Sequence, residues 1–392
     1  MGLLHEQFNT LSDASSAITS SRFFDRIQAV LAQADIRING NRPWDLQVHN
    51  AKLFTRLLRH GALGFAEAYM EGWWDCPQVD QLLTRMLKAE LSTKLGGINR
   101  LRLALSAIKY TLLNHQTEQR AHIVGEVHYD IGNDLYNRML DPTMSYSCGY
   151  WQQATDLNSA QIDKLDLICR KLELKPGMRL LDIGCGWGGL AEFAARNYGV
   201  SVVGVTISKE QKRLADERVA GLPVTIKLQD YRSLNGTFDR IASVGMFEHV
   251  GAKNYPTFFH TAKRLLKTDG LFLLHTIGEE QTSHRPEPFI DKYIFPNGNV
   301  ASRKHLQDAT LGHFRLEDWH NFGQDYDLTL MAWAENFQRA WPELDANYSQ
   351  RFYRMWLYYL YGCAAFFRSR RGQLWQLVLA HPQRTASYRC PR

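Results

Sequence analysis

The sequence predicts an α/β protein with a mostly parallel, doubly wound sheet, preceded by a smaller, mainly helical N-terminal domain. From about residue 165 onward, β-rich runs alternate with segments of helical length, and a glycine-rich turn follows the first run. Residues 1–115 instead show mainly helical spacing of apolar side chains. Residues 116–125 are polar and are expected to form a linker, which assigns residues 126–392 to the second domain.

Strands and helices are expected to alternate along the second domain. The strands are predicted at residues 179–184, 200–206, 224–228, 238–245 and 270–276, and the helices at residues 189–197, 209–220 and 254–266. This alternation is typical of a parallel sheet that is covered on both faces. Ligands of such sheets bind beyond the carboxyl ends of the strands. The residues that follow each strand are therefore candidate site residues.

Three features stand out in the first domain. Residues 50–70 show helical spacing that is interrupted near Gly61 and Gly64, which predicts two short helices. Asn39 and Gly40 form a turn pair that suggests a small hairpin. Residues 88–109 place basic side chains among leucines, a pattern typical either of a helix on an anionic membrane or of a solvated helix over a core.

Composition limits the class of protein. The 392 residues include 45% hydrophobic and 22% charged residues, which excludes a disordered or collagen-like chain. The net charge of +6 favours an anionic partner without choosing between membrane and nucleic acid. The six cysteines form no CxxC pair, so we expect reduced thiols and no metal site. The sequence shows neither a signal peptide nor a membrane span, which predicts a cytoplasmic protein.

The glycine-rich turn reads Asp-Ile-Gly-Cys-Gly-Trp-Gly-Gly over residues 182–189. Gly184, Gly186 and Gly189 satisfy the GxGxxG pattern of dinucleotide-binding domains. The same turn, with Asp182 before it and Gly188 within it, resembles the acidic GxGxG signature of S-adenosylmethionine-dependent methyltransferases.

The next strands favour S-adenosylmethionine over a dinucleotide. No acidic residue ends the second strand, which departs from both patterns, and Thr206 and Gln211 could offer neutral hydrogen bonds instead. The third strand ends at Asp230 and Tyr231, where an acid and a ring suit the amino group and face of adenine.

Longer motifs make the resemblance specific. In chain order they are HYDIGNDLY, MSYSCGYW, LLDIGCGWGGLAEFAA, VVGVTISKEQ, LQDYR, VGMFEHVG, LLHTIG, KYIFPNG and EDWHNFGQDYDLTLMAW. Together they resemble the cyclopropane-fatty-acyl-phospholipid synthase family from about residue 125 to about residue 379. The first 115 residues resemble the helical domain of the bacterial, phospholipid-acting branch.

This resemblance implies a Rossmann-like domain that moves a methylene from S-adenosylmethionine onto the cis double bond of an unsaturated acyl chain in a membrane phospholipid. It also implies a bound bicarbonate ion as the base, a homodimer, and a peripheral position on the inner face of the cell membrane. The N-terminal domain would dock on the anionic bilayer, and no nucleic-acid partner is expected.

The motifs also imply site residues. The bicarbonate would be held by Glu248, His275 and Tyr326, with help from the backbone of Cys148 and Ile277. The residues expected at S-adenosylmethionine are Tyr146, Ser147, Asp182, Gly184, Cys185, Gly186, Trp187, Gly188, Gly189, Thr206, Gln211, Asp230 and Tyr231. Cys363 lies in an apolar helical segment near these motifs, and because methylene transfer needs no protein nucleophile we expect it to pack against or line the site.

Three alternatives stay open at this point. A related enzyme could deliver a methyl branch and would need a reductant. A methyltransferase could act on small molecules or nucleic acid, although no (N/D)PP(Y/F) motif follows the fourth strand. A lipid-binding protein could retain the fold without activity.

Overall fold

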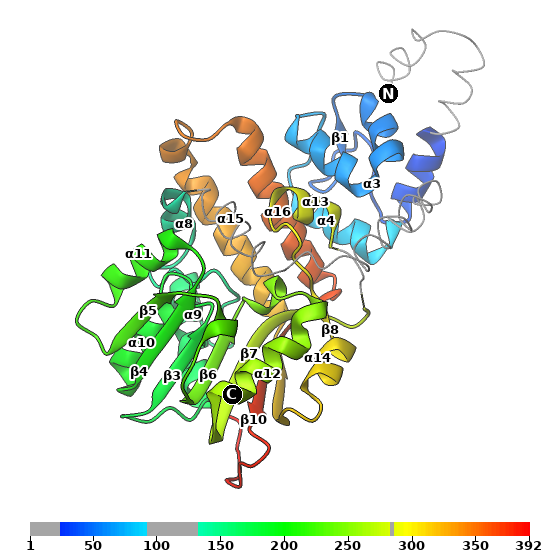
Figure 1. The fold of residues 1–392 in the computed structure, drawn as a ribbon. Helices are drawn as coiled ribbons and strands as arrows, with labels where there is room; N and C mark the ends of the chain where they lie inside the picture. Colours follow the sequence, from blue (N-terminus) through cyan, green and yellow to red (C-terminus); the bar gives the residue numbers. More distant parts are fainter. Residues whose placement is uncertain (1–23, 92–131, 283–285) are drawn as a thin grey trace.

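The computed structural model describes residues 24–91, 132–282 and 286–392. Its centre is an eight-stranded sheet in which seven strands follow the order β5-β4-β3-β6-β7-β10-β9, and β8 pairs with β7 (Figure 1). The bounds of these strands are Arg179–Ile183 (β3), Ser201–Thr206 (β4), Val224–Leu228 (β5), Phe238–Val244 (β6), Leu266–Glu279 (β7), Ala301–Ser302 (β8), Arg315–Asn321 (β9) and Gly372–Ala380 (β10).

The predicted α/β class is confirmed. Strands β3 to β7 pair in parallel, and the five predicted strands all occur near their expected positions. The antiparallel pairs β7–β10 and β10–β9 were not predicted. They extend the sheet beyond its parallel part: β10 lies next to β7, and β9 forms the edge beyond β10.

Alternate residues of each central strand face opposite helical layers, as the period of two requires. On β7, Leu271 and Leu273 pack in the core beneath α9 and α10, whereas Phe272 and Leu274 pack in the core beneath α12 and α14. Because both faces are covered, the buried middle of these strands is mostly apolar. A polar side chain in their interior is therefore unusual.

The helices have local sequence signals at their ends. Asp156 and Ser159 form a capping box at the start of α9 (Leu157–Lys171), and Ser208 caps α11 (Lys209–Arg218). Gly188 and Gly199 take left-handed conformations on either side of α10 (Gly189–Tyr198). The other helices of this part of the chain are α8 (Asn133–Met139), α12 (Tyr255–Leu265), α13 (Pro288–Tyr293), α14 (Arg303–Thr310), α15 (Gln324–Leu344) and α16 (Gln350–Arg368).

The helical N-terminal region is confirmed, and its helix over Lys52–Met70 (α3) changes direction where expected. Gly61 lies inside α3 with φ 57° and ψ −139°, values outside the helical range. The predicted hairpin is wrong in its pairing, because β1 (Gln47–Val48) pairs antiparallel with β2 (Trp74–Asp75) rather than with the segment before Asn39. Trp74 is fully buried there and stacks on Phe65 at 4.3 Å between ring centroids.

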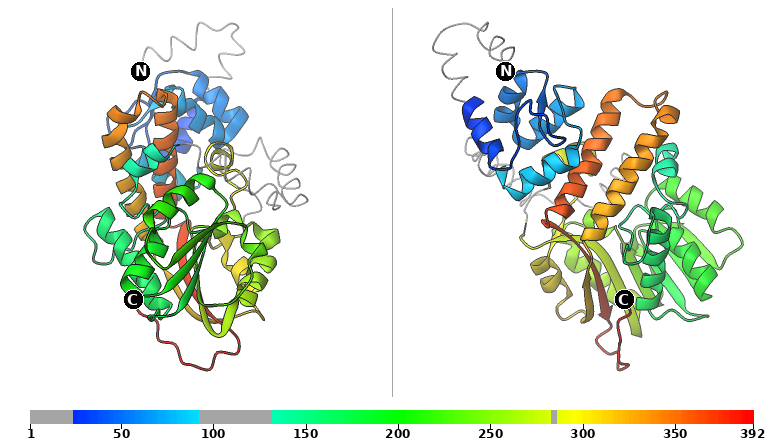
Figure 2. Two further views of the ribbon diagram at one scale, coloured as in Figure 1. Left: turned by 60° about the vertical axis from the view of Figure 1, so that its left-hand side comes forward. Right: turned by 180° about the vertical axis from the view of Figure 1, so that it is seen from behind.

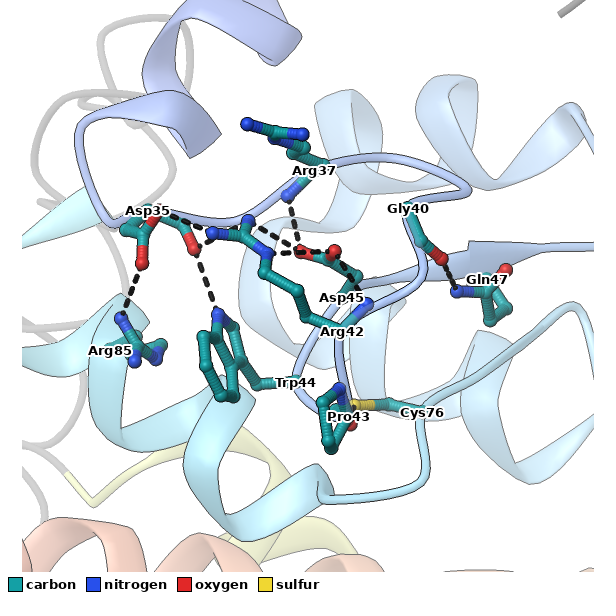
Figure 3. Close-up of polar contacts among 10 residues, drawn as sticks. All are labelled: Asp35, Arg37, Gly40, Arg42, Pro43, Trp44, Asp45, Gln47, Cys76 and Arg85. Carbon is teal, nitrogen blue, oxygen red and sulfur yellow. Dashed lines mark hydrogen bonds and ion pairs between the residues drawn. The ribbon is translucent and has the colours of Figure 1, made fainter.

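The turn at Asn39 and Gly40 is held in part by a buried carboxylate (Figure 3). An isolated parallel bridge between Ile38 and Leu46 also joins its two sides. Asp45 accepts hydrogen bonds from the backbone N–H of Arg37 at 2.8 Å and from the backbone N–H and Nε of Arg42 at 3.1 and 2.9 Å. Burial and these bonds oppose each other, and the pKa of Asp45 is lowered overall. The turn therefore depends on an ionised Asp45.

The long helices α15 and α16 connect the sheet to the N-terminal region. They lie side by side between the two (Figures 1 and 2), and α16 packs against both α3 and α4 (Val79–Lys88). Arg368 of α16 forms ion pairs with Asp80 of α4 and with Asp327 of α15, the latter at 2.8 Å. Arg354 of α16 donates to Asp75 at 2.6 Å. This contact surface therefore combines apolar packing with charges that are partly buried around Arg368 and more exposed at Asp75.

Two predictions fall outside the described residues. These are the linker at residues 116–125 and most of the basic segment at residues 88–109, because the described ranges stop at residue 91 and resume at residue 132. Within the described ranges, no helix combines the length and apolar character that crossing a bilayer requires.

The substitution Arg368→Met is expected to lower the free energy of unfolding by about 2 kcal/mol, because it removes two charge-assisted contacts and leaves two carboxylates unpaired. The control Arg339→Met removes an exposed pair with Glu335 on α15 and should change stability by less than about 0.5 kcal/mol. Urea denaturation followed by tryptophan fluorescence measures both. Equal midpoints for the two variants would contradict this view of the contact.

Candidate active site

The glycine-rich turn leaves β3 at the carboxyl edge of the sheet and enters α10. Gly184, Gly186 and Gly188 have φ values of 82°, 53° and 82°, which L side chains rarely adopt. A Cβ atom on Gly184 would lie 2.6 Å from Met246, and one on Gly189 would lie 2.3 Å from the carbonyl oxygen of Thr143. A Cβ on Gly186 would meet nothing within 4 Å. The turn is thus tightly packed at its ends and open at its middle glycine, where a ligand can approach the backbone.

A second segment, residues 141–150, lies against this turn through the contact at Thr143. Tyr146 shares a hydrogen bond of 2.8 Å with Tyr359 of α16. Ser147 is buried, and its Oγ accepts a hydrogen bond of 3.0 Å from Lys164 of α9. Trp187 is also buried, and its indole N–H donates to Asn133 at 3.2 Å. The expected residues therefore come from two segments: Tyr146 and Ser147 from residues 141–150, and Trp187 from the turn itself.

Buried charges lie under this part of the site. Burial raises the pKa of Asp182 to about 7, and Lys164 opposes that shift. Burial likewise lowers the pKa of Lys164 to about 8, while Asp141 opposes the change. Oδ2 of Asp182 has no hydrogen-bond partner in the described structure. Cys185, next in the turn, is buried as well, and burial raises the pKa of its thiol.

The ends of β4 and β5 carry the other residues expected at the cofactor. The hydroxyl of Thr206 donates to Oε1 of Gln211 at 2.8 Å, and both side chains are buried. The Asp230 carboxylate accepts from the guanidinium of Arg232 at 2.9 and 2.6 Å. Tyr231 packs edge-on against Phe258. Oδ1 of Asp230 also accepts from the backbone N–H of Arg232 at 2.9 Å, so Arg232 fixes the orientation of this carboxylate at the end of β5.

Glu248 follows β6 and reaches across to β7. Its Oε1 accepts hydrogen bonds from the backbone N–H of Ile277 at 2.7 Å and from the hydroxyl of Thr276 at 3.1 Å. Its Oε2 is buried with no partner among the described residues. Burial raises the pKa of this carboxyl, and the bonds from Ile277 and Thr276 oppose the rise. The Ile277 N–H, which the motifs assign to the bicarbonate, thus donates to the Glu248 carboxylate in this structure.

His275 lies in the interior of β7, 1% exposed. Its Nδ1 is 3.2 Å from the amide nitrogen of Gln376 on β10. Its Nε2 is buried without a hydrogen-bond partner in the described ranges. Burial, with Lys164 and Lys171 nearby, lowers the pKa of His275 well below its usual value. The imidazole is therefore neutral at physiological pH.

The other expected residues gather beside these two. Cys148, Ile277 and Tyr326 belong to one packed cluster together with Phe322, and the Phe322 ring contacts His275 edge-on at 5.8 Å. Tyr326 comes from the first turn of α15 and stacks on Phe367 of α16 at 4.6 Å. Burial raises its pKa, so the phenol stays protonated and can donate a hydrogen bond.

The two thiols of the site are not activated. Burial raises the pKa of Cys148 well above its usual value and that of Cys363 to about 12. The thiolate is the nucleophilic form of cysteine, so burial disfavours the reactive form of both thiols. Cys363 packs against the core cluster of α15 and α16, as expected from the sequence.

Sequence reasoning missed two buried polar residues of this region, Lys164 and Gln376. A signal was present for each. Lys164 falls on the apolar stripe of α9, between buried Gln161 and Leu165, and Gln376 interrupts the apolar run of β10. A polar side chain in a buried pattern usually has a specific partner.

Gly186→Ala is expected to raise the dissociation constant of S-adenosylhomocysteine about tenfold, because the new methyl projects into the open side of the turn. Gly177→Ala is the matched control. Gly177 has φ 83° and equally open surroundings in the turn before β3. Isothermal titration calorimetry separates the two, and equal affinities would contradict a ligand at Gly186.

In the native protein at pH 8, Cys148 and Cys363 should remain unmodified by iodoacetamide over an hour, because burial keeps both thiols protonated. Peptide mass spectrometry measures the labelling, and the same protein in guanidinium provides the fully labelled reference. Stoichiometric alkylation of Cys148 without denaturant would show that the thiol is activated.

Comparison with known proteins gives the family. Residues 115–377 match the family model described as mycolic acid cyclopropane synthetase. The chain is 56% identical over 351 residues to the cyclopropane-fatty-acyl-phospholipid synthase of Escherichia coli K12, covering 90% of this chain and 91% of that protein. It is also 37% identical to a probable fatty acid methyltransferase of Pseudomonas putida, covering 78% and 83% of the two chains.

Two solved structures of cyclopropane synthases are also similar to this chain. The mycolic acid cyclopropane synthase CmaA1, in complex with SAH and CTAB, superposes with a TM-score of 0.62 at 35% identity, covering 66% of this chain and 97% of that one. The cyclopropane synthase MmaA2 of Mycobacterium tuberculosis gives a TM-score of 0.63 at 34% identity, covering 66% and 98%. The chain therefore belongs to the cyclopropane-fatty-acyl-phospholipid synthase family, within the S-adenosylmethionine-dependent methyltransferases.

Proposed function

We propose that this enzyme transfers a methylene from S-adenosylmethionine to the cis double bond of an unsaturated acyl chain in a membrane phospholipid, forming a cyclopropane ring. The observation that carries the mechanism is the pair of buried, unpartnered polar atoms, Glu248 Oε2 and His275 Nε2, at the carboxyl edge of the sheet. Leaving such atoms unpaired is costly. They therefore suit a small polar ligand that binds between them.

The reaction sets the demands on the site. The alkene attacks the methyl group, the S–CH₃ bond breaks, and S-adenosylhomocysteine leaves while a carbocation forms on the acyl chain. The added methyl then loses a proton and the ring closes. The first step needs exclusion of water and exact positioning. The second needs a base in surroundings that are otherwise apolar.

We propose that the ligand is bicarbonate, which when bound would supply the base for that proton. Glu248, held by Thr276 and Ile277, would accept the hydrogen of its hydroxyl with Oε2. His275 and Tyr326 would donate to the remaining oxygens, as the neutral imidazole and the protonated phenol allow. The Cys148 backbone would complete the set.

The residues proposed to bind S-adenosylmethionine come from different structural elements, and each element would contact a different part of the molecule. The turn over residues 184–189 would bind the amino-acid part of S-adenosylmethionine through its backbone, with Tyr146 and Ser147 covering it. Thr206 and Gln211 would offer neutral hydrogen bonds to the ribose, and Asp230 with Tyr231 would meet the adenine. The small size and left-handed conformation of Gly186 support this assignment.

The acyl chain would lie against the apolar cluster between α15 and α16. Among its buried members are Trp333, Trp356, Tyr359 and Phe367. Ring faces attract positive charge, so the same wall can stabilise the developing carbocation as well as exclude water.

Membrane docking and dimerisation complete the proposal. The net charge of +6 favours an anionic bilayer, and the basic residues at 88–109 are the proposed contact, although most of them lie outside the described residues. Two linked docking regions in a homodimer would gain avidity at the inner face of the membrane.

The test uses labelled S-adenosylmethionine, vesicles of monounsaturated phospholipid, and buffer with or without bicarbonate. Mass spectrometry of the released fatty acids should show a gain of one CH₂ with loss of the olefin, dependent on bicarbonate. Glu248→Gln should lower kcat by about 10²- to 10⁴-fold, whereas the exposed control Glu335→Gln should leave it unchanged.

Each other outcome is informative. A product heavier by two hydrogens would identify a methyl branch in place of a ring. Full activity in carbonate-free buffer with the Glu248→Gln variant would exclude the proposed base. Binding of S-adenosylhomocysteine without any lipid product would assign the substrate to another class.

A further inference from the structure

Gln376 lies beside His275, on the neighbouring strand β10. The two residues are directly opposite each other in the antiparallel pair of β10 and β7, so their side chains project from the same face. That face carries Leu271, Leu273 and Val378 and is covered by α9 and α10. Gln376 is 0% exposed. An amide in this position was not expected from the sequence motifs.

The hydrogen bond between them determines which nitrogen of His275 carries the proton. The amide nitrogen of Gln376 is 3.2 Å from Nδ1 of His275. In the orientation that the structure gives the Gln376 amide, its nitrogen faces Nδ1 and its Oε1 has no partner among the described residues. An amide nitrogen can only donate, so in this orientation Nδ1 accepts and is unprotonated. A neutral imidazole has a single N–H, which then lies on Nε2. Nε2 is the buried atom that has no partner among the described residues.

We propose that Gln376 is a positioning residue that fixes His275 as an Nε2–H donor to the bound anion and prevents it from acting as the base. In this tautomer the Nδ1 lone pair is engaged by Gln376, and Nε2 has no free lone pair. His275 therefore cannot accept the proton released during ring closure. The inference rests on the proposed function only for the identity of the anion.

The surroundings reinforce this arrangement. The edge contact with Phe322 restricts the plane of the His275 ring, and the antiparallel ladder on either side of the pair fixes the separation of the two backbones. Rotation of the ring would move Nδ1 away from the amide. The donor direction of Nε2 is therefore built into the sheet.

The test measures the tautomer directly. The protein is labelled with ¹⁵N-histidine, and the His275 signals are assigned by their loss in His275→Asn. In the wild type, Nδ1 should give the shift of an unprotonated nitrogen and Nε2 that of a protonated one. Gln376→Glu replaces the donor by a carboxylate that binds Nδ1–H, so the Nδ1 signal should move to the protonated range.

Gln373→Glu is the matched control. Gln373 lies on the same strand opposite Gly278, and its Oε1 accepts from Asn321 and Trp375, a role that a carboxylate retains. This variant should leave both His275 signals and kcat unchanged. Gln376→Glu should lower kcat about 10- to 100-fold with little change in the KM for S-adenosylmethionine, as expected for a partner behind a ligand-binding histidine.

Either of two results would overturn the inference: a protonated Nδ1 in the wild type, or unchanged His275 signals in folded Gln376→Glu. If that variant does not fold, Gln376→Met removes the donor without adding charge, and the wild-type spectrum remains decisive. Because the spectrum needs no turnover, a fixed tautomer in a protein that makes no cyclopropane would refute the proposed function while leaving the role of Gln376 intact.

Discussion

The antiparallel pairing of β10 with β7 is the constraint on which the rest of this structure depends. β7 pairs in parallel with β6 on one side and carries His275 and Ile277, and β10 follows directly after α16. The pairing therefore holds α16 at the sheet, and β9 on the other side of β10 does the same for α15. These two helices supply Tyr326, Cys363 and the aromatic wall. They also hold the N-terminal region through Arg354 and Arg368.

Burial of polar groups gives the site its chemical character. Glu248, His275, Lys164 and Asp182 are all desolvated, and each has a pKa shifted toward its neutral form. Electrostatic interactions are strong in such surroundings because little water screens them. A reaction that creates a carbocation and then releases a proton benefits from exactly placed polar atoms in an otherwise apolar space. The unpartnered atoms of Glu248 and His275 fit that requirement.

The thiols show why placement matters more than residue type. Cysteine is a common nucleophile, and besides Cys185 in the glycine-rich turn two cysteines, Cys148 and Cys363, lie in or beside the site. Burial raises the pKa of both thiols, and at Cys148 it outweighs the opposing effect of Lys164, so burial disfavours the reactive thiolate. The same burial leaves Tyr326 as a donor and His275 as a neutral ring. Burial thus determines the protonation state of most titratable groups in the site.

Much of the fold could be predicted from the sequence, because the β-rich runs that alternate with helical segments and the glycine turn are local signals. The five parallel strands and the break at Gly61 follow from such patterns, and the motif order predicts the family. Other features depended on contacts between distant residues. The strands β9 and β10 and the pairing of β1 with β2 join segments far apart in the chain, as do Gln376 with His275 and Lys164 with Ser147. Local sequence determines which residues form a strand or a turn. Only the folded sheet decides which side chains face each other, because register and layer packing are set by the whole core.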